Sequence, residues 1–168
     1  TPATLQPLTQ AEMEAHCRTF GADNVDVLPY LYAAAEHIET ITGRAFLTQT
    51  WRGYLDCFPW SDEIQIPKGW LASVTHVKYW GADDTEYTLP TTEYAVDLGG
   101  DSFGRIKLKY NKTWPSVTLR TLNPVEVQFV AGKTTAGDLP HAIRQAIRLL
   151  GASWYEHREE VVLGSSAA

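Results

Sequence analysis

The chain has 168 residues, of which 44% are hydrophobic and 20% charged, and its formal net charge is −6. These values are typical of a globular protein that forms one domain, or one domain with a sizeable insertion. The acidic balance argues against tight binding to nucleic-acid phosphates, which requires clustered Lys and Arg. No run approaches the ~20 apolar residues of a membrane span, and the polar N-terminus lacks a signal pattern. We therefore expect no membrane association.

A first helix is predicted near the N-terminus. The segment Thr9–Glu12 has the spacing of a capping box, in which a hydroxyl and a glutamate satisfy each other's backbone N–H groups. The helix is expected to run through about Phe20 and to end at Gly21.

A second helix is predicted to follow, capped by Asp23 or Asn24. Pro29 fits in its first turn, and Gly43 is suited to a left-handed C-terminal cap. Its apolar residues recur on one helical face. They are Leu28, Leu31, Ala35, Ile38 and Ile41.

Short segments rich in Val, Ile, Thr, Tyr and Trp follow, and most of them alternate apolar and polar residues, as β-strands do. Gly81–Asp84 and Gly99–Asp101 are expected to be hairpin turns, and residues 111–123 an ordered loop. The expected strands are Phe46–Phe58, Glu63–Ile66, Leu71–Trp80, Thr85–Leu89, Tyr94–Asp97, Arg105–Tyr110 and Val125–Ala131.

A long final helix is predicted from Leu139 to about Glu160, with Asp138 as its cap and Pro140 in its first turn. Its apolar stripe consists of Ile143, Ile147, Leu150 and Trp154, while Arg144, Arg148, His157 and Arg158 fall mostly off the stripe. Because the second and the last helix both carry long apolar stripes, we expect them to pack together.

This order of elements predicts an α+β fold. A small helical bundle would contain the two N-terminal helices and the long C-terminal helix. This helical hub would comprise residues 1–45 and 133–168. Residues 46–132 would form an inserted antiparallel β-rich subdomain of about six short strands.

No catalytic, cofactor or metal site is expected. The sequence contains no GxSxG, HExxH, P-loop or GxGxxG motif. The acidic pairs Asp83–Asp84 and Glu159–Glu160 are interpreted as solvated charges, and the cysteines Cys17 and Cys57 as small buried hydrophobic residues. The histidines have no fixed spacing to a nucleophile or to one another. They are His16, His37, His76, His141 and His157.

Aromatic residues crowd the β region, where they either build the core of a small sheet or stack on sugars or bases. They are Trp51, Trp60, Trp70, Trp80, Trp114, Tyr54, Tyr79, Tyr87, Tyr94 and Tyr110. The β region also holds a basic cluster, which is either a solvated outer face or a nucleic-acid stripe. It consists of Lys107, Lys109, Lys112 and Arg120.

Three consecutive apolar residues, Val161, Val162 and Leu163, lie near the C-terminus. Termini are usually polar and loose. These residues therefore either fold back on the helices or become ordered on a neighbouring chain.

Several segments together resemble the head–tail connector, or adaptor, proteins of long-tailed bacteriophages and gene transfer agents. The order and spacing of the segments carry the resemblance, which runs over nearly the whole chain. The segments are LTQAEMEAH, ETITGRAFLTQTW, IQIPKGWLASVTHVKYW, YAVD, NKTWP, VEVQFVAG and LPHAIRQAIRLLGASWYEHREEVV.

The resemblance implies a structural, non-enzymatic protein of the virion neck at the capsid portal vertex, made in the host cytoplasm. Twelve copies would form a ring on the portal, next to a stopper or tail-side neck protein, and extend the DNA channel towards the tail. The family's portal-docking segment corresponds here to the residues from about Val161 on, although relatives often continue past the position of Ala168. The basic cluster would face the channel or a neighbouring subunit. Net acidity would keep passing DNA from adhering. The competing hypothesis is an aromatic-rich β module that binds carbohydrate or another ligand.

Overall fold

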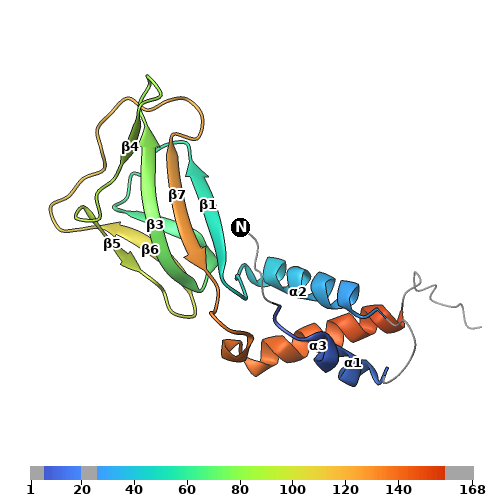
Figure 1. The fold of residues 1–168 in the computed structure, drawn as a ribbon. Helices are drawn as coiled ribbons and strands as arrows, with labels where there is room; N and C mark the ends of the chain where they lie inside the picture. Colours follow the sequence, from blue (N-terminus) through green and yellow to red (C-terminus); the bar gives the residue numbers. More distant parts are fainter. Residues whose placement is uncertain (1–5, 20–25, 158–168) are drawn as a thin grey trace, which may run out of the picture. The chain divides into compact units, whose positions relative to one another are not determined.

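The computed structural model describes residues 6–19 and 26–157, and within them it shows an α+β fold (Figure 1). The elements in chain order are α1 (Gln10–Cys17), α2 (Leu28–Thr42), β1 (Gln49–Leu55), β2 (Glu63–Gly69), β3 (Leu71–Trp80), β4 (Glu86–Thr88), β5 (Tyr94–Asp97), β6 (Phe103–Leu108), β7 (Val125–Ala131), a 3-10 turn (Ala136–Asp138) and α3 (His141–Glu156). The expected fold class is confirmed, with seven strands in place of about six.

The described residues form two compact units. Of the described residues, the helical unit contains 6–19, 26–41 and 139–157, and the β unit contains 42–138. Along the chain, the β unit therefore interrupts the helical unit.

Helix α1 begins with the predicted capping box. The Thr9 hydroxyl accepts from the backbone N–H of Glu12 at 3.2 Å, and the Glu12 carboxylate accepts from that of Thr9 at 2.9 Å. The prediction that the helix runs through Phe20 was wrong. Arg18 adopts φ 56°, and its N–H bonds to the carbonyl of Glu14. This left-handed residue ends the helix at Cys17; Phe20 and Gly21 lie outside the described residues.

Helix α2 begins later than predicted. The Asp26 carboxylate accepts from the backbone N–H of Leu28 at 3.1 Å, so Asp26 serves the helix start. The predicted caps, Asp23 and Asn24, lie outside the described residues. Pro29 is the second residue of the helix, and Gly43 follows its end with φ 64°, both as expected.

Helix α3 is shorter than predicted at its start, because Asp138 does not cap it. The Asp138 carboxylate instead accepts from the backbone N–H and the hydroxyl of Thr135, at 3.1 and 2.9 Å. The helix begins at His141, and Pro140 occupies the cap position without a side-chain hydrogen bond. Of the predicted stripe, Ile147 is buried and the other three residues are half-buried.

The three helices of the helical unit lie side by side (Figure 1). As expected, α2 contacts α3: the rings of Tyr30 and Tyr155 lie 5.8 Å apart, and those of His37 and Trp154 lie 5.6 Å apart. Helix α1 packs on α3 as well. Gly151 leaves the space that the buried side chain of Met13 occupies, because a Cβ there would lie 2.7 Å from the Met13 methyl.

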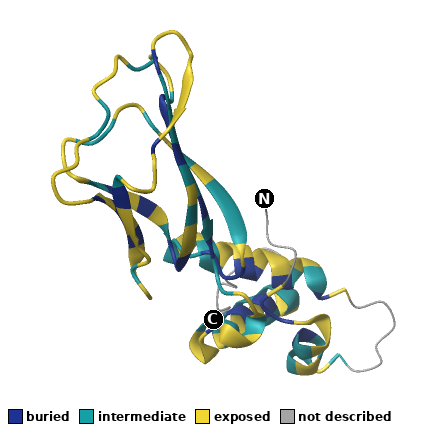
Figure 2. Ribbon diagram, turned by 60° about the vertical axis from the view of Figure 1, so that its left-hand side comes forward, coloured by how far each residue is buried: buried dark blue, intermediate teal, exposed yellow. Residues whose placement is uncertain are grey.

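The β unit contains two antiparallel sheets. The larger sheet has the order β1-β7-β3-β4 and the smaller sheet the order β2-β6-β5. Both predicted hairpin turns are confirmed: Gly81–Asp84 joins β3 to β4, and Gly99–Asp101 joins β5 to β6. Buried and exposed residues alternate along β6 (Figure 2), so one face of this strand points to the core.

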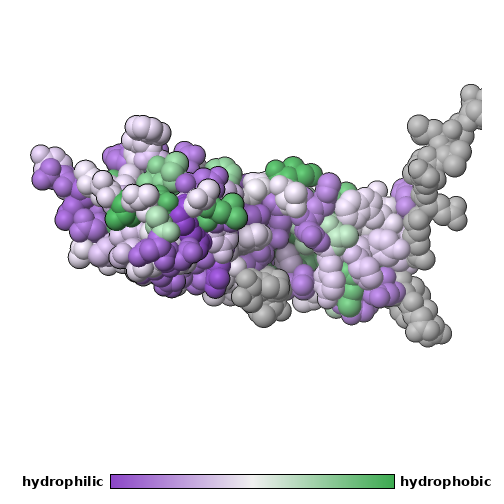
Figure 3. Space-filling view, turned by 90° about the horizontal axis from the view of Figure 1, so that it is seen from above, coloured by the Kyte–Doolittle hydropathy of each residue, from purple (hydrophilic) through white to green (hydrophobic). Residues whose placement is uncertain are grey.

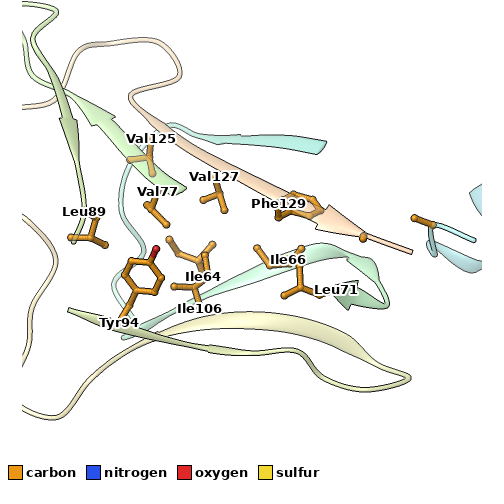
Figure 4. Packing of buried hydrophobic residues seen from close by; sticks show 12 residues of the cluster. Ile64, Ile66, Leu71, Val77, Leu89, Tyr94, Ile106, Val125, Val127 and Phe129 are labelled. Atoms are coloured by element: carbon orange, nitrogen blue, oxygen red, sulfur yellow. The ribbon is translucent and has the colours of Figure 1, made fainter. Parts of the chain in front are cut away.

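The core of the β unit lies between the two sheets (Figure 4). Val125, Val127 and Phe129 of β7 point towards Ile64 of β2 and Ile106 of β6. All five side chains are at most 5% exposed. Because β7 is an inner strand of its sheet, between β1 and β3, these apolar contacts bind both sheets into one unit.

Candidate assembly surfaces

The outer face of the larger sheet carries a buried glutamate, Glu126 of β7. It is 7% exposed, the only charged side chain buried among the described residues. Its carboxylate lies 3.0 Å from Nε2 of His76 and 4.0 Å from the Arg52 guanidinium. Glu126 and Gln128 alternate with Val125, Val127 and Phe129, and this alternation by itself assigns Glu126 to a solvent-facing side of the strand. What hides it is the central position of β7, because side chains from β1 and β3 close over it.

The surroundings of Glu126 keep it ionised. Burial alone would raise the pKa of its carboxyl group, but hydrogen bonds from His76 and Tyr54 and the charge of Arg52 outweigh burial. The pKa therefore lies below its ordinary value. One carboxylate thus joins three adjacent strands, which indicates a structural role for Glu126.

The outer face of the smaller sheet is organised around Arg105 of β6. Its guanidinium contacts Asp97 of β5 at 3.1 Å and Glu63 of β2 at 3.2 Å. The cation therefore bridges all three strands of the sheet. This face is consequently charge-paired, which is unlike an open cationic surface for nucleic acid.

The predicted basic cluster is divided between two places in the β unit. Lys107 lies 3.4 Å from the Asp62 carboxylate, Lys112 lies 3.1 Å from that of Glu93, and Lys109 donates to the carbonyl of Thr91 at 3.0 Å. Lys107 points to the exposed face of β6. Arg120 contacts a different part of the β unit from these lysines: its guanidinium stacks on the ring of Trp80, 4.3 Å from the ring centre.

Several aromatic rings of the β unit pack on one another. Trp114 stacks on Phe58 at 5.2 Å, Phe58 meets Tyr79 edge-on, and Tyr79 stacks on Tyr87 at 5.2 Å. One face of Trp114 and one of Trp80 are thus occupied within the chain. Two other rings are almost fully exposed: Trp60 is 106% and Tyr110 99% accessible relative to the extended residue. On the face shown in Figure 3, apolar areas are separate patches between hydrophilic ones.

A surface hollow of about 530 Å³ lies at the β3–β4 turn and the segment that crosses it. It is lined by Ala82, Asp84, Leu119, Arg120, Thr121, Leu122 and Asn123. Two hydrogen bonds hold the crossing segment to the turn: the N–H of Arg120 donates to the carbonyl of Trp80, and that of Ala82 to the carbonyl of Thr118. The hollow is therefore formed by backbone contacts as well as by side chains.

In the helical unit, Glu12 ties α1 to α3. One carboxylate oxygen accepts from Arg144 at 2.5 Å and from Arg148 at 3.0 Å, while the other completes the capping box with Thr9. The backbone bond from Thr9, then the bond from the Thr9 hydroxyl and the charges of the two guanidinium groups, lower the pKa of Glu12 despite partial burial. We call these contacts of Glu12 with Arg144 and Arg148 the clamp. Its only sign in the sequence was the spacing of the two arginines, four residues apart and off the apolar stripe of α3.

Other side chains that could hold a metal or react are dispersed. The described residues contain no group of three or more His, Cys, Asp or Glu that could bind a metal ion. The prediction of two buried cysteines was wrong for Cys57, which is exposed; Cys17 is half-buried, and burial raises its pKa.

No helix within the described ranges is long and apolar enough to cross a bilayer. Val161, Val162 and Leu163 lie outside these ranges.

No protein-family model matches the chain, and no curated protein matches its sequence. Solved structures do match. A chain of the "virion of native gene transfer agent (GTA) particle" aligns with 99% of this chain and 88% of its own length, with 27% identity and a TM-score of 0.78.

Two further matches come from GTA particle necks. A chain of the neck of the empty particle, computed with C6 symmetry, has 28% identity and a TM-score of 0.76 over 98% of this chain and 87% of its own. A chain of the native neck, computed with C12 symmetry, has 26% identity and a TM-score of 0.76 over 99% and 87%. This chain is thus similar, over nearly its full length, to structural chains of a virion and its neck.

Proposed function

We propose that this chain is a structural protein of a virion neck: a ring-forming head–tail connector that docks on the portal and extends the DNA channel towards the tail. The observation that carries the proposal is the similarity to GTA neck chains, at 26–28% identity and TM-scores of 0.76 over 98–99% of this chain. Symmetry of order six or twelve in those necks supports a ring of copies.

The charge pattern of the β unit fits a protein that borders DNA without gripping it. Arg105 is paired with two carboxylates, and Lys107 and Lys112 with one each. Paired cations release few counterions from DNA and therefore add little affinity for its phosphates. In the proposed ring, Lys107, Lys109, Lys112 and Arg120 face the channel or the neighbouring subunit.

Portal docking is assigned to Val161, Val162 and Leu163, which would gain burial on the portal surface. A stopper or tail-side neck protein would bind the opposite side of the ring. In dilute solution, the protein is expected to be a monomer or a loose oligomer, because rings of this kind form on a template. An obligate tight dimer in light scattering would contradict this expectation.

Electron microscopy of the protein mixed with portal rings tests the assignment. We expect the wild-type protein to stack rings on portal rings. A variant without residues 161–168 should keep its circular dichroism spectrum and fail to dock, whereas removal of residues 165–168 alone should have no effect. Full docking by the longer truncation would refute the role of the three apolar residues.

The alternative of a carbohydrate-binding module receives less support, because Trp80 and Trp114 each stack on a group of the same chain. A clear positive on a glycan array, abolished by Trp60→Ala, would revive it.

A further inference from the structure

We propose that Trp60 of one copy of this chain inserts into the hollow beside Arg120 of the next copy, so that neighbouring β units interlock. We call Trp60 with Tyr110 the anchor, and the hollow lined by residues 82, 84 and 119–123 the socket. The inference rests on the proposed function in one respect, which is that copies of the chain form a ring.

The anchor consists of two exposed aromatic residues at the same end of one strand pair. Glu63 of β2 pairs with Lys107 of β6, and Trp60 precedes the first by as many residues as Tyr110 follows the second. In an antiparallel pair, both therefore lie beyond the same end. Neither ring is covered within the chain, since both are about fully accessible. Trp and Tyr are the residue types that most often dominate protein–protein interfaces.

The backbone around the anchor is held in place. On the C-terminal side of Trp60, the indole N–H of Trp114 donates to the carbonyl of Ser61 at 2.7 Å, and the N–H of Leu108 donates to that of Asp62 at 2.8 Å. The N–H of Lys109, next to Tyr110, donates to the carbonyl of Glu93 at 2.9 Å. Because the loops are already ordered, a partner would lose little conformational entropy to engage them.

The charges near the anchor indicate a protein partner. Lys107, Lys109 and Lys112 are each engaged by an oxygen of the same chain, at 3.4, 3.0 and 3.1 Å. An exposed aromatic surface that binds nucleic acid would combine stacking rings with unpaired cations along the backbone. Here the rings are surrounded by neutralised polar groups, which is the pattern of a protein interface with a polar rim.

The socket is large enough to receive an indole ring, and its lining combines polar side chains with two leucines. Its volume of about 530 Å³ is within the usual range of ligand pockets, ~300–1,000 Å³. Leu119 and Leu122 supply apolar contacts, and Leu122 is 72% exposed. Arg120 already stacks on Trp80 at 4.3 Å, and a planar guanidinium can stack an aromatic ring on each face. Its Nε is buried without a hydrogen-bond partner.

The occupant is a second copy because the β unit carries both halves of the contact. A closed ring needs two different, complementary patches on every subunit, so that the contact repeats around the axis. Two of the chains similar to this one come from necks computed with C6 or C12 symmetry, and a head-to-tail contact between neighbouring copies would recur around such an axis. An anchor and a socket at different places of one unit satisfy this requirement.

Ring assembly on portal rings tests the inference with Trp60→Ala and Leu122→Asp, and with Leu149→Asp as control. Leu149 is also an exposed leucine, 57% accessible, but belongs to α3. Each of the first two changes should raise the protein concentration for half-maximal assembly by about tenfold or more, as expected for an interface hot spot. The control should assemble as wild type does. Rings of Trp60→Ala at the wild-type concentration would overturn the inference and leave the proposed function intact.

Mixing the two variants distinguishes loss of a specific contact from general destabilisation of the protein. Trp60→Ala retains a socket and Leu122→Asp retains an anchor, so at a protein concentration at which the wild type self-associates, an equimolar mixture should contain a dimer that neither variant forms alone. A second measurement places the photo-crosslinker p-benzoylphenylalanine at position 60. Crosslinks to residues 82–84 or 119–123 of another copy support the inference. Crosslinks to the portal, to a glycan or to another surface of the chain overturn it. If the wild type forms no rings on portal, the proposed function fails, and crosslinking at high protein concentration still decides the pairing.

Discussion

Replacing Glu12 should loosen the helical unit by removing two kinds of contact at once. Glu12→Ala removes the carboxylate of the capping box, worth about 1 kcal/mol. It also removes the contacts to Arg144 and Arg148, whose side chains are 20% and 26% exposed. At such partly screened sites each contact contributes ~0.5–1 kcal/mol. The expected loss in the free energy of unfolding is therefore about 2–3 kcal/mol.

Two further variants separate the contributions. Glu12→Gln keeps a side chain that can complete the capping box, and so should lose only the part due to the arginines, about 1–2 kcal/mol. Glu14→Ala is the matched control: its carboxylate accepts one bond, from Gln10 at 2.6 Å, and its loss should be below about 0.5 kcal/mol. Hydrogen exchange of peptides from α1 and α3, read by mass spectrometry, reports on the helical unit separately from the β unit.

The dependence on pH supplies an independent check. The folded-state pKa of Glu12 is depressed, so its contribution is complete above the ordinary value of 4.5 and is lost as the pH falls through the folded-state pKa. The difference in the free energy of unfolding between wild type and Glu12→Gln should therefore have its full size at neutral pH and should disappear in acid. Equal protection of wild type and Glu12→Gln at neutral pH, or equal losses for Glu12→Ala and Glu14→Ala, would refute the reasoning.

Two other predictions concern the β unit and are read from urea unfolding followed by near-UV circular dichroism. Gly132→Ala should cost more than about 2 kcal/mol, because Gly132 has φ 111° and a Cβ would collide with the carbonyl of Leu47. Gly100→Ala, at φ 57° with open space around it, should cost only about 1 kcal/mol; equal costs would exclude the collision. Glu126→Gln should cost about 1–2 kcal/mol at neutral pH and less in acid, because the folded-state pKa of Glu126 is depressed. The control Glu86→Gln removes the ion pair with Lys78; because the Glu86 side chain is 48% exposed, this change should leave the free energy of unfolding nearly unchanged. A loss as large as that of Glu126→Gln would argue against a special role of Glu126.

The order and type of the elements could be predicted from the sequence, because periodicity and turn residues act locally. The seven strand segments and the glycine turns are examples. Helix ends were predicted less well where a residue has two potential partners. Asp138 was expected to cap α3, and it binds Thr135 instead. Both arrangements satisfy a carboxylate, and only the path of the chain through the 3-10 turn decides between them.

The candidate surfaces were harder to predict because they depend on which strands are neighbours. Alternation assigns Glu126 to the outer face but gives no indication that β7 is central, and this position buries the side chain. Likewise, the sequence gives no sign of which tryptophan of the β unit is exposed. Only the structure distinguishes the exposed ring of Trp60 from the stacked rings of Trp80 and Trp114. The four basic residues looked like one cluster in sequence, and their partners divide them.

The interruption of the helical unit by the β unit has a consequence for biosynthesis. A ribosome releases α1 and α2 long before α3, and all seven strands emerge in between. The clamp on Glu12 and the ring contacts of Tyr30 and His37 can close only after that delay. A truncated nascent chain therefore exposes an unfinished pair of helices, which proteases can recognise. Only a chain translated through α3 can complete the helical unit, so the order of elements along the chain itself selects complete chains.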